Sequence, residues 1–229
     1  ERAVRKLFAP MSGPDNPVPE VSARKVDPDG ELFVHPTKLK GAGVIVAAPG
    51  MRLTDVKDRL AMSVLDTVIS GYRLPRGWLH SELRGRKLVY VVHAYNWAGL
   101  IPGVFLTYAQ CEPKNAKLVA GIITEKLRQT LTHQFTRQEV DEAINMILTA
   151  ELLANQSMGS LGMQAALDEL YGFGFDFRKS YEKRLRAVTP AEVSRVARKY
   201  LAGGYVTTVV TPAPELFKTT DSTPSDPKE

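Results

Sequence analysis

The second half of the chain carries two helix-start signals of the same kind. Thr136 is followed three residues later by Glu139, and Thr189 by Glu192, with Pro190 between them at the first helical position. In such a capping box the threonine hydroxyl and the glutamate carboxylate bond backbone amides that the first helical turn leaves free. Apolar residues at helical spacing follow each box, so we expect helices that begin at these positions and bury one face.

Two further helices are predicted earlier in the chain. Pro113 opens one of them, whose apolar residues recur at helical spacing as far as Leu131. Thr54 is the predicted N-cap of the other. Gly71 is its predicted end, because glycine readily takes the left-handed conformation that closes a helix.

Segments rich in β-branched and aromatic residues alternate with these helices. Residues 43–48, 88–95, 104–109 and 205–210 are predicted strands. Glycines and a proline in 96–103 indicate a turn, so the second and third strands are expected to form an antiparallel hairpin. Both faces of 88–95 are apolar. This predicts a central strand covered on both sides, or a strand covered on one side with a partner surface on the other.

The order of these elements is strand, helix, strand, strand, three helices and a last strand. Strands and helices that are partly segregated in this way favour an α+β domain. We expect a mixed or antiparallel sheet with helices packed on one face and with the last strand returning to the sheet. Fold class alone does not determine function.

The two ends of the chain differ in composition from the middle. Residues 1–8 are predicted to be the last turns of a helix, and a proline-rich stretch follows them. We therefore expect residues 1–30 to be the end of a preceding lobe and its linker, and residues 31–211 to be one folded lobe. Residues 212–229 are rich in proline, threonine and serine, which predicts a mobile tail. The start at Glu1, without a methionine, indicates a cut or processed chain.

Charge and cysteine content exclude several function classes. The net charge of +5 is spread over short clusters without interleaved aromatics, so no nucleic acid partner is expected. The single cysteine, Cys111, excludes an internal disulfide and a cysteine-based zinc site. No apolar run approaches the roughly 20 residues that cross a bilayer. We expect no membrane span and a soluble protein of bacterial type, either cytoplasmic or extracytoplasmic.

An ordered set of motifs resembles a known family. The set comprises a strand that ends at Pro49 and Gly50, a helix, the segment 76–84, the strand that contains Tyr90, and the two capping boxes. Together they resemble the pitrilysin/insulinase family of zinc peptidases, which includes mitochondrial processing peptidase. The resemblance is to the C-terminal lobe of such an enzyme and runs from about Phe8 to Pro212.

The resemblance implies a lobe that binds substrate but not zinc. In the family, two related lobes enclose a chamber that holds a peptide, and the first lobe binds zinc through a His-x-x-Glu-His motif. The present chain lacks that motif. The resemblance therefore implies that zinc is bound by an N-terminal lobe or a separate subunit, and that this chain is inactive alone. A zinc site built from His80, Glu82 and His93 is the less favoured alternative.

Arg84 and Tyr90 match the two positions through which the family's C-terminal lobe reaches the bound peptide. A guanidinium can donate to a substrate carbonyl, and a phenol can donate to the oxygen that develops charge in the tetrahedral intermediate. The spacing is one residue shorter than is usual in the family, which leaves Arg86 as an alternative to Arg84. From the residues alone, Tyr90 could instead share a core face with Val92 and Ala94, and Arg84 could compensate a helix end.

Two functions are therefore carried forward. The first is the substrate-binding lobe of a zinc metalloendopeptidase that cleaves peptides in a chamber between two lobes. The alternative is a non-catalytic scaffold or assembly subunit of the same family. The apolar strand faces also make a homodimer plausible. In the simplest interpretation, His80 is an exposed helix residue and His93 a packed strand residue.

Overall fold

The computed structural model describes residues 2–9, 25–71 and 76–217. Within these ranges five strands form one mixed sheet in the order β1, β5, β2, β4, β3. The strands are β1 (Glu31–Pro36), β2 (Ala42–Pro49), β3 (Val89–Trp97), β4 (Val104–Cys111) and β5 (Val206–Thr211). β5 runs parallel to β1 and antiparallel to β2, so the last strand returns to the sheet as predicted.

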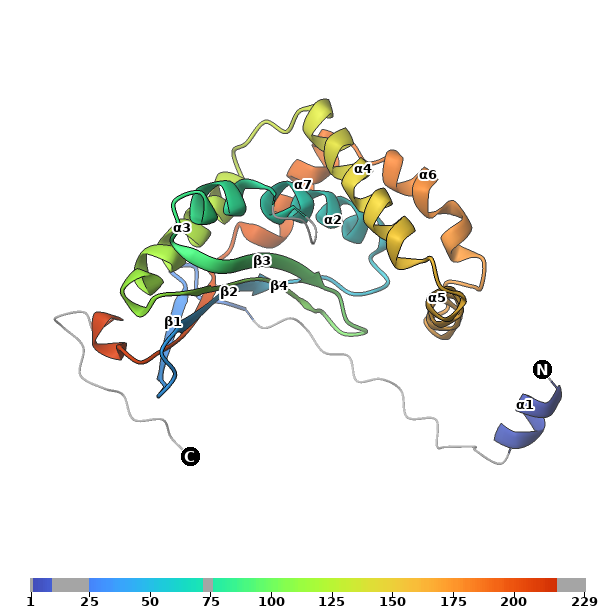
Figure 1. Cartoon of the computed structure of the whole chain (residues 1–229). Coiled ribbons are helices and arrows are strands. Elements are labelled where there is room, and N and C mark those ends of the chain that lie inside the picture. The colour runs from blue at the N-terminus through green and yellow to red at the C-terminus, as the bar shows by residue number, and fades with distance from the viewer. Residues whose placement is uncertain (1, 10–24, 72–75, 218–229) are drawn as a thin grey trace.

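The helices that contact this sheet all lie on one of its faces, which confirms the predicted α+β class (Figure 1). In chain order they are α1 (Arg2–Phe8), α2 (Val56–Ser70), α3 (Ala116–Gln129), α4 (Arg137–Ala154), α5 (Met158–Leu170), α6 (Tyr181–Arg186) and α7 (Pro190–Leu201). α2, α3 and α7 contact the strands directly, and α4 packs across α2. A short π-helix, η1 (His80–Arg84), precedes β3 and contacts it.

The two faces of the sheet differ in burial. Val44 and Val46 of β2 are fully buried under the helices, whereas Ile45 between them is 41% exposed. We call the uncovered side the open face. Its large apolar residues, each at least 39% exposed, are Phe33, Ile45, Tyr95, Trp97 and Val210. The core of the chain therefore lies between the sheet and the helices, and the open face is available to a partner.

Several local predictions are confirmed. In each capping box the threonine hydroxyl accepts a hydrogen bond from the glutamate amide, and the glutamate carboxylate accepts one from the threonine amide. Gly71 ends α2 with a left-handed backbone at φ 78°. The hairpin of β3 and β4 is antiparallel along both strands.

Two predictions are wrong, and one strand was not predicted. β3 lies at the edge of the sheet and helices cover only one of its faces, so the alternative of a central strand covered on both sides is wrong, whereas a strand covered on one side agrees with the structure. β1 was missed, because none of its six residues is fully buried and the segment lacks a clear apolar alternation. Thr54 does not cap α2; the N-cap is Asp55, whose carboxylate accepts a hydrogen bond from the Arg52 amide at 3.0 Å.

The predicted ends are described only in part. Residues 2–8 form the expected helix, while residues 10–24 of the predicted linker lie outside the described residues. After β5, a 3-10 turn, η4 (Pro214–Phe217), places Phe217 against the core. Residues 218–229 of the predicted tail also lie outside the described residues. Among the helices that the structure describes, none has the length and apolar character needed to cross a bilayer.

Candidate functional site

The π-helix η1 places Arg84 at the edge of the sheet. Leu79, just before η1, and Leu83 within it are fully buried and anchor this segment in the core. Gly85 follows directly, and a side chain there would collide with the carbonyl oxygen of Ser81, so the tight path requires glycine. Because the anchors point inward, Arg84 is left exposed.

Arg84 and Arg86 differ in how they are held. The guanidinium of Arg86 donates to Glu82 at 2.8 Å, and the same carboxylate lies 3.9 Å from Lys126. The guanidinium of Arg84 forms no hydrogen bond or ion pair with any described residue. Lys87 completes the turn with a left-handed backbone at φ 56°. Of the two arginines, Arg84 is therefore the one whose guanidinium has no partner among the described residues.

His80 and His93 form a pair beside Arg84. Their rings meet edge-on, with 5.2 Å between the centroids. His80 is only 5% exposed, so the predicted exposed position is wrong: the π-helical path turns its ring against β3. Burial lowers the pKa of both histidines, and the positive charge of Arg84 lowers each further. Both rings are therefore expected to be neutral at pH 7.

The residues around this pair do not fit a zinc ion. Glu82, which would have to be the third ligand beside His80 and His93, is engaged by Arg86. Among the residues that the structure describes, no group of three histidine, cysteine, aspartate or glutamate side chains is arranged to hold a metal. A zinc site in this part of the chain is thus not supported, because zinc requires at least three protein ligands.

Tyr90 occupies a β-bulge near the start of β3. Val89 pairs with Cys111 and Val92 with Ala109, and all four are buried under the helices. The two residues between them, Tyr90 and its neighbour, face a single residue of β4, so the bulge turns Tyr90 away from the covered face. Tyr90 is 62% exposed, which excludes the alternative of a core tyrosine.

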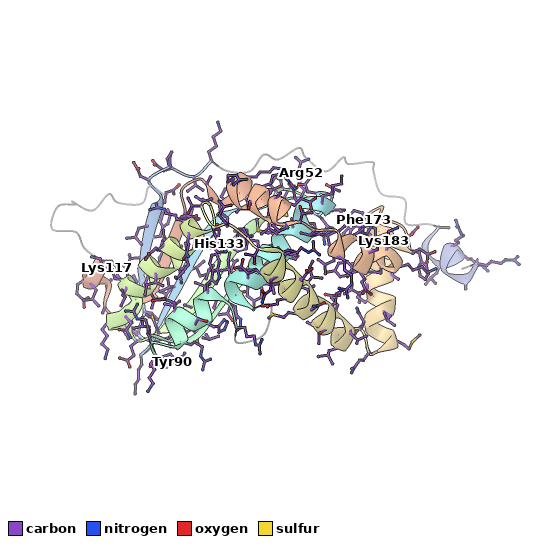
Figure 2. All side chains as sticks on the ribbon, turned by 90° about the horizontal axis from the view of Figure 1, so that it is seen from above. Arg52, Tyr90, Lys117, His133, Phe173 and Lys183 are labelled. Atoms are coloured by element: carbon purple, nitrogen blue, oxygen red, sulfur yellow. The ribbon has the colours of Figure 1, made fainter. Side chains whose placement is uncertain are left out.

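Arg84 and Tyr90 thus flank the first half of β3 without bonding to each other. Arg84 acts electrostatically on His93. Tyr90 lies near Lys114, whose pKa is raised mainly by a hydrogen bond to Glu112 and to a smaller degree by Tyr90. Along a strand, the three residues from Tyr90 to His93 span roughly 10 Å. Figure 2 shows Tyr90 at the periphery of the molecule.

The open face beside these residues is aromatic. Tyr95 of β3 stacks on Tyr108 of β4 at 5.8 Å, and His93 lies 5.8 Å from Tyr108 between ring centroids. A hollow of about 490 Å³ adjoins them, lined by Ile45, Tyr95, Asn96, Trp97, Leu106 and Tyr108. A partner surface on this strand was one of the two alternatives predicted from sequence, but its aromatic character was not, although the alternation of His93, Tyr95 and Trp97 in β3 indicates one aromatic face.

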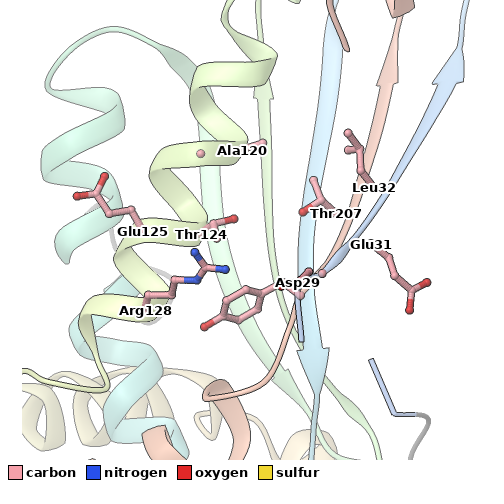
Figure 3. Close-up of a pocket in the computed structure, with 11 residues that line it drawn as sticks. Asp29, Glu31, Leu32, Ala120, Thr124, Glu125, Arg128 and Thr207 are labelled. Carbon is pink, nitrogen blue, oxygen red and sulfur yellow. The ribbon is translucent and has the colours of Figure 1, made fainter. Parts of the chain in front are cut away.

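A second hollow, of about 500 Å³, lies at the other edge of the sheet (Figure 3). Arg128 and Thr124 line it from α3, and Glu31 and Thr207 line it from β1 and β5. Because β1 and β3 form opposite edges of the sheet, this hollow is separate from Arg84 and Tyr90. It contains none of the predicted site residues.

Comparisons with known proteins agree with this fold and with the predicted family. The family described as the peptidase M16 inactive domain matches residues 1–147. An uncharacterized zinc protease of Streptomyces coelicolor is 29% identical over 206 aligned positions, in a match that covers 87% of this chain and 44% of that protein.

Solved structures share the fold at low identity. A peptidase M16 inactive domain from Pseudomonas fluorescens has a TM-score of 0.76 at 16% identity, and the match covers 93% of this chain and 52% of that one. A putative zinc protease from Bordetella pertussis has a TM-score of 0.63 at 19% identity, and the match covers 76% of this chain and 94% of that one. A chain of complex III2 from Candida albicans has a TM-score of 0.68 at 16% identity, and the match covers 82% of this chain and 47% of that one. The chain spans about half the length of the Streptomyces and Pseudomonas proteins.

Proposed function

Because the chain belongs to the family of peptidase M16 inactive domains, we propose that it is the substrate-binding lobe of a zinc metalloendopeptidase. In this proposal an unfolded peptide lies over the open side of β3, in a chamber between this lobe and a second one. Zinc would be held by the second lobe, in the same chain or in a separate subunit. The described residues alone would then have no peptidase activity.

The observation that carries the proposal is the free and exposed state of Arg84. An arginine that has no partner in the described chain keeps all five N–H donors available. Its neighbour Arg86 is bound to Glu82, so the two arginines are not equivalent. A planar guanidinium can donate two parallel hydrogen bonds to a peptide carbonyl or carboxylate. We infer that Arg84 positions the peptide backbone.

Tyr90 has a complementary role in this proposal. A phenol on an exposed bulge can donate to a substrate oxygen that gains negative charge during hydrolysis. The stacked rings of Tyr95 and Tyr108 would provide a flat apolar surface for the side chains of the same peptide. The exposure of Tyr90, at 62%, supports a contact with a ligand over a role in packing.

The lobe boundaries form part of the proposal. We propose residues 31–211 as the lobe, because β1 begins at Glu31 and β5 ends at Thr211. Residues 1–30 would belong to the end of a preceding lobe and its linker, and residues 212–229 to a tail. The twofold greater length of the Streptomyces relative supports a second lobe in the whole protein.

A scaffold role is the second candidate. The exposed apolar residues Ile45 and Trp97 on the open face would suit a permanent protein contact, including a homodimer. The shared fold with a chain of complex III2 is compatible with such a role. In that case Arg84 and Tyr90 would have no effect on peptide binding.

Peptide binding separates the two candidates. The complete protein, with its second lobe or subunit, is titrated against a labelled unfolded peptide while fluorescence anisotropy is recorded. We expect Arg84→Ala to weaken binding about ten-fold, or about 1.4 kcal/mol. Arg86→Ala is the matched control, because its guanidinium is bound to Glu82, and it should change affinity less than two-fold. Equal affinity of Arg84→Ala and wild type would contradict the substrate-lobe proposal.

A further inference from the structure

A partly enclosed cavity of about 150 Å³ lies between α2 and the segment that follows α5. Three arginines line it: Arg59 from α2, Arg178 from the 3-10 turn η3 (Phe177–Ser180), and Arg184 from α6. Figure 2 shows Lys183 of α6 at the opposite end of the molecule from Tyr90. The cavity is therefore separate from the proposed peptide site.

Arg178 is compensated by acidic groups within the cavity wall. Its Nε donates to Asp168 at 3.2 Å, and its Nη1 donates to Glu151 at 3.4 Å. Its guanidinium also lies 5.3 Å from the ring centroid of Tyr181. Both carboxylates of the cavity are thus engaged by one arginine.

Arg59 and Arg184 are compensated less directly. In the described chain, neither forms an ion pair with a carboxylate. Among the described residues, the guanidinium of Arg59 donates only to the carbonyl oxygen of Leu53, at 2.8 Å. Arg184 donates to the carbonyl oxygen of Phe177 at 2.9 Å and stacks on that ring at 3.7 Å. Its Nε is buried without a hydrogen-bond partner among the described residues.

The state of these two arginines is energetically unfavourable without a counter-ion. Burial lowers the pKa of Arg59 and of Arg184, and the nearby charge of Arg178 lowers both further, while the more distant carboxylate of Asp168 offsets this only in part. A buried cation that lacks an anion, and a buried donor that lacks an acceptor, both cost free energy. An anion in the cavity would relieve both costs.

We propose that this cavity binds a small oxyanion, such as phosphate or a carboxylate, between Arg59 and Arg184. The planar fork of each guanidinium matches a pair of oxygens on such an anion. The phenol of Tyr181 also lines the cavity, and burial raises its pKa to about 12, so it remains a hydrogen-bond donor. The volume equals roughly five water molecules, which is sufficient for one such ion.

Phosphate binding tests the proposal directly. The full chain is titrated with inorganic phosphate at pH 7 and constant ionic strength, while the 31P line width and the melting temperature are recorded. We expect saturable broadening and a rise in melting temperature for the wild type. Arg59→Gln and Arg184→Gln should each weaken binding at least ten-fold. Arg86→Gln, which changes an arginine outside the cavity, should bind phosphate as the wild type does.

A second variant of Arg184 and a competition between anions complete the test. If Arg184→Gln fails to fold, Arg184→Lys keeps the charge but removes the fork, and phosphate should then bind more weakly than to the wild type. Acetate should displace phosphate if the site recognises oxyanions, whereas chloride at equal ionic strength should not. No saturable binding to the wild type, binding that survives both glutamine substitutions, or equal displacement by chloride would each overturn the proposal.

Discussion

The ring of His80 meets the ring of His93 edge-on, with 5.2 Å between their centroids. His80 belongs to η1 and His93 to β3, so this contact fixes the π-helix against the edge strand. Arg84 ends the same π-helix, and its charge acts on both rings. The position of Arg84 relative to β3 therefore depends on how η1 packs against the strand.

The two histidines should titrate below their ordinary range. Burial first, and the charge of Arg84 second, lower the pKa of His93 from its usual value of 6.5. We expect Arg84→Ala to raise the pKa of His93, because it removes a nearby positive charge. Imidazole NMR signals followed from pH 8 to pH 4 measure this directly. Arg86→Ala is the control and should leave the titration unchanged; an identical titration in both variants would show that Arg84 points elsewhere.

The same shifts predict that the two histidines contribute less stability in mild acid. A histidine with a lowered pKa in the folded state binds its proton more readily in the unfolded chain. Its contribution is therefore complete above pH 6.5 and declines as the pH falls through the folded-state pKa of His80 and His93. Urea unfolding of wild type and His93→Gln at pH 7.5 and pH 5.5 measures this contribution: relative to wild type, His93→Gln should be more stable at pH 5.5 than at pH 7.5.

Asp66 should make the chain less stable at alkaline pH. Burial raises its pKa to about 7, although Ser70 donates a hydrogen bond to the carboxylate at 2.9 Å. The folded state thus favours the protonated acid. The contribution of Asp66 to the free energy of unfolding is lost as the pH rises from the unfolded pKa near 3.8 to the folded pKa of about 7. We therefore expect the free energy of unfolding of Asp66→Asn, measured relative to wild type, to rise by roughly 2 to 3 kcal/mol between pH 5 and pH 8.

Urea unfolding of both proteins at the two pH values measures this effect. Asp141→Asn is a suitable control, because Asp141 is an exposed partner of Arg137 on α4. Its stability relative to wild type should not vary between pH 5 and pH 8. If Asp66→Asn behaves in the same way as this control, Asp66 is not a buried protonated acid.

Asp58 should link α2 to α7. Its carboxylate accepts hydrogen bonds from Arg195, Lys199 and Tyr200, each at 2.7 Å. Burial alone would raise its pKa, but the three hydrogen bonds outweigh burial and lower the pKa to about 2. The stability from this group is complete above the unfolded pKa of 3.8 and is lost as the pH falls to about 2.

Removal of this carboxylate should destabilise the fold. We expect Asp58→Asn to lower the free energy of unfolding by about 2 kcal/mol at pH 7, because three donors lose a charged acceptor. Asp141→Asn, at an exposed helical ion pair, should cost no more than about 0.5 kcal/mol. Chemical unfolding of both variants measures the difference, and equal costs would mean that the Asp58 cluster is not a stabilising link.

The features that were predictable from sequence are those set by a few adjacent residues. The capping boxes at Thr136 and Thr189 and the left-handed Gly71 require only local hydrogen bonds or a single backbone angle. The hairpin of β3 and β4 is also local in sequence. Arg84 was selected by resemblance, and its exposure agrees with the role that the resemblance implies.

The features that were missed depend on distant neighbours. The place of β3 at the edge of the sheet follows from β5, which inserts between β1 and β2 and not beside β3. The exposure of Tyr90 follows from a bulge, which a period of two residues cannot reveal. His80 is buried because η1 has π-helical geometry.

Cleavage by the complete protein tests the central proposal most directly. The protein, with its second lobe or subunit and measured zinc content, is assayed on an unfolded peptide, and kcat/KM is compared among wild type, Arg84→Ala, Tyr90→Phe and Arg86→Ala. We predict a loss of at least ten-fold, about 1.4 kcal/mol, for Arg84→Ala and Tyr90→Phe, and near wild-type rates for Arg86→Ala. Cleavage that is unaffected by Arg84→Ala and Tyr90→Phe, or absent with zinc and every partner present, would contradict the substrate-lobe account.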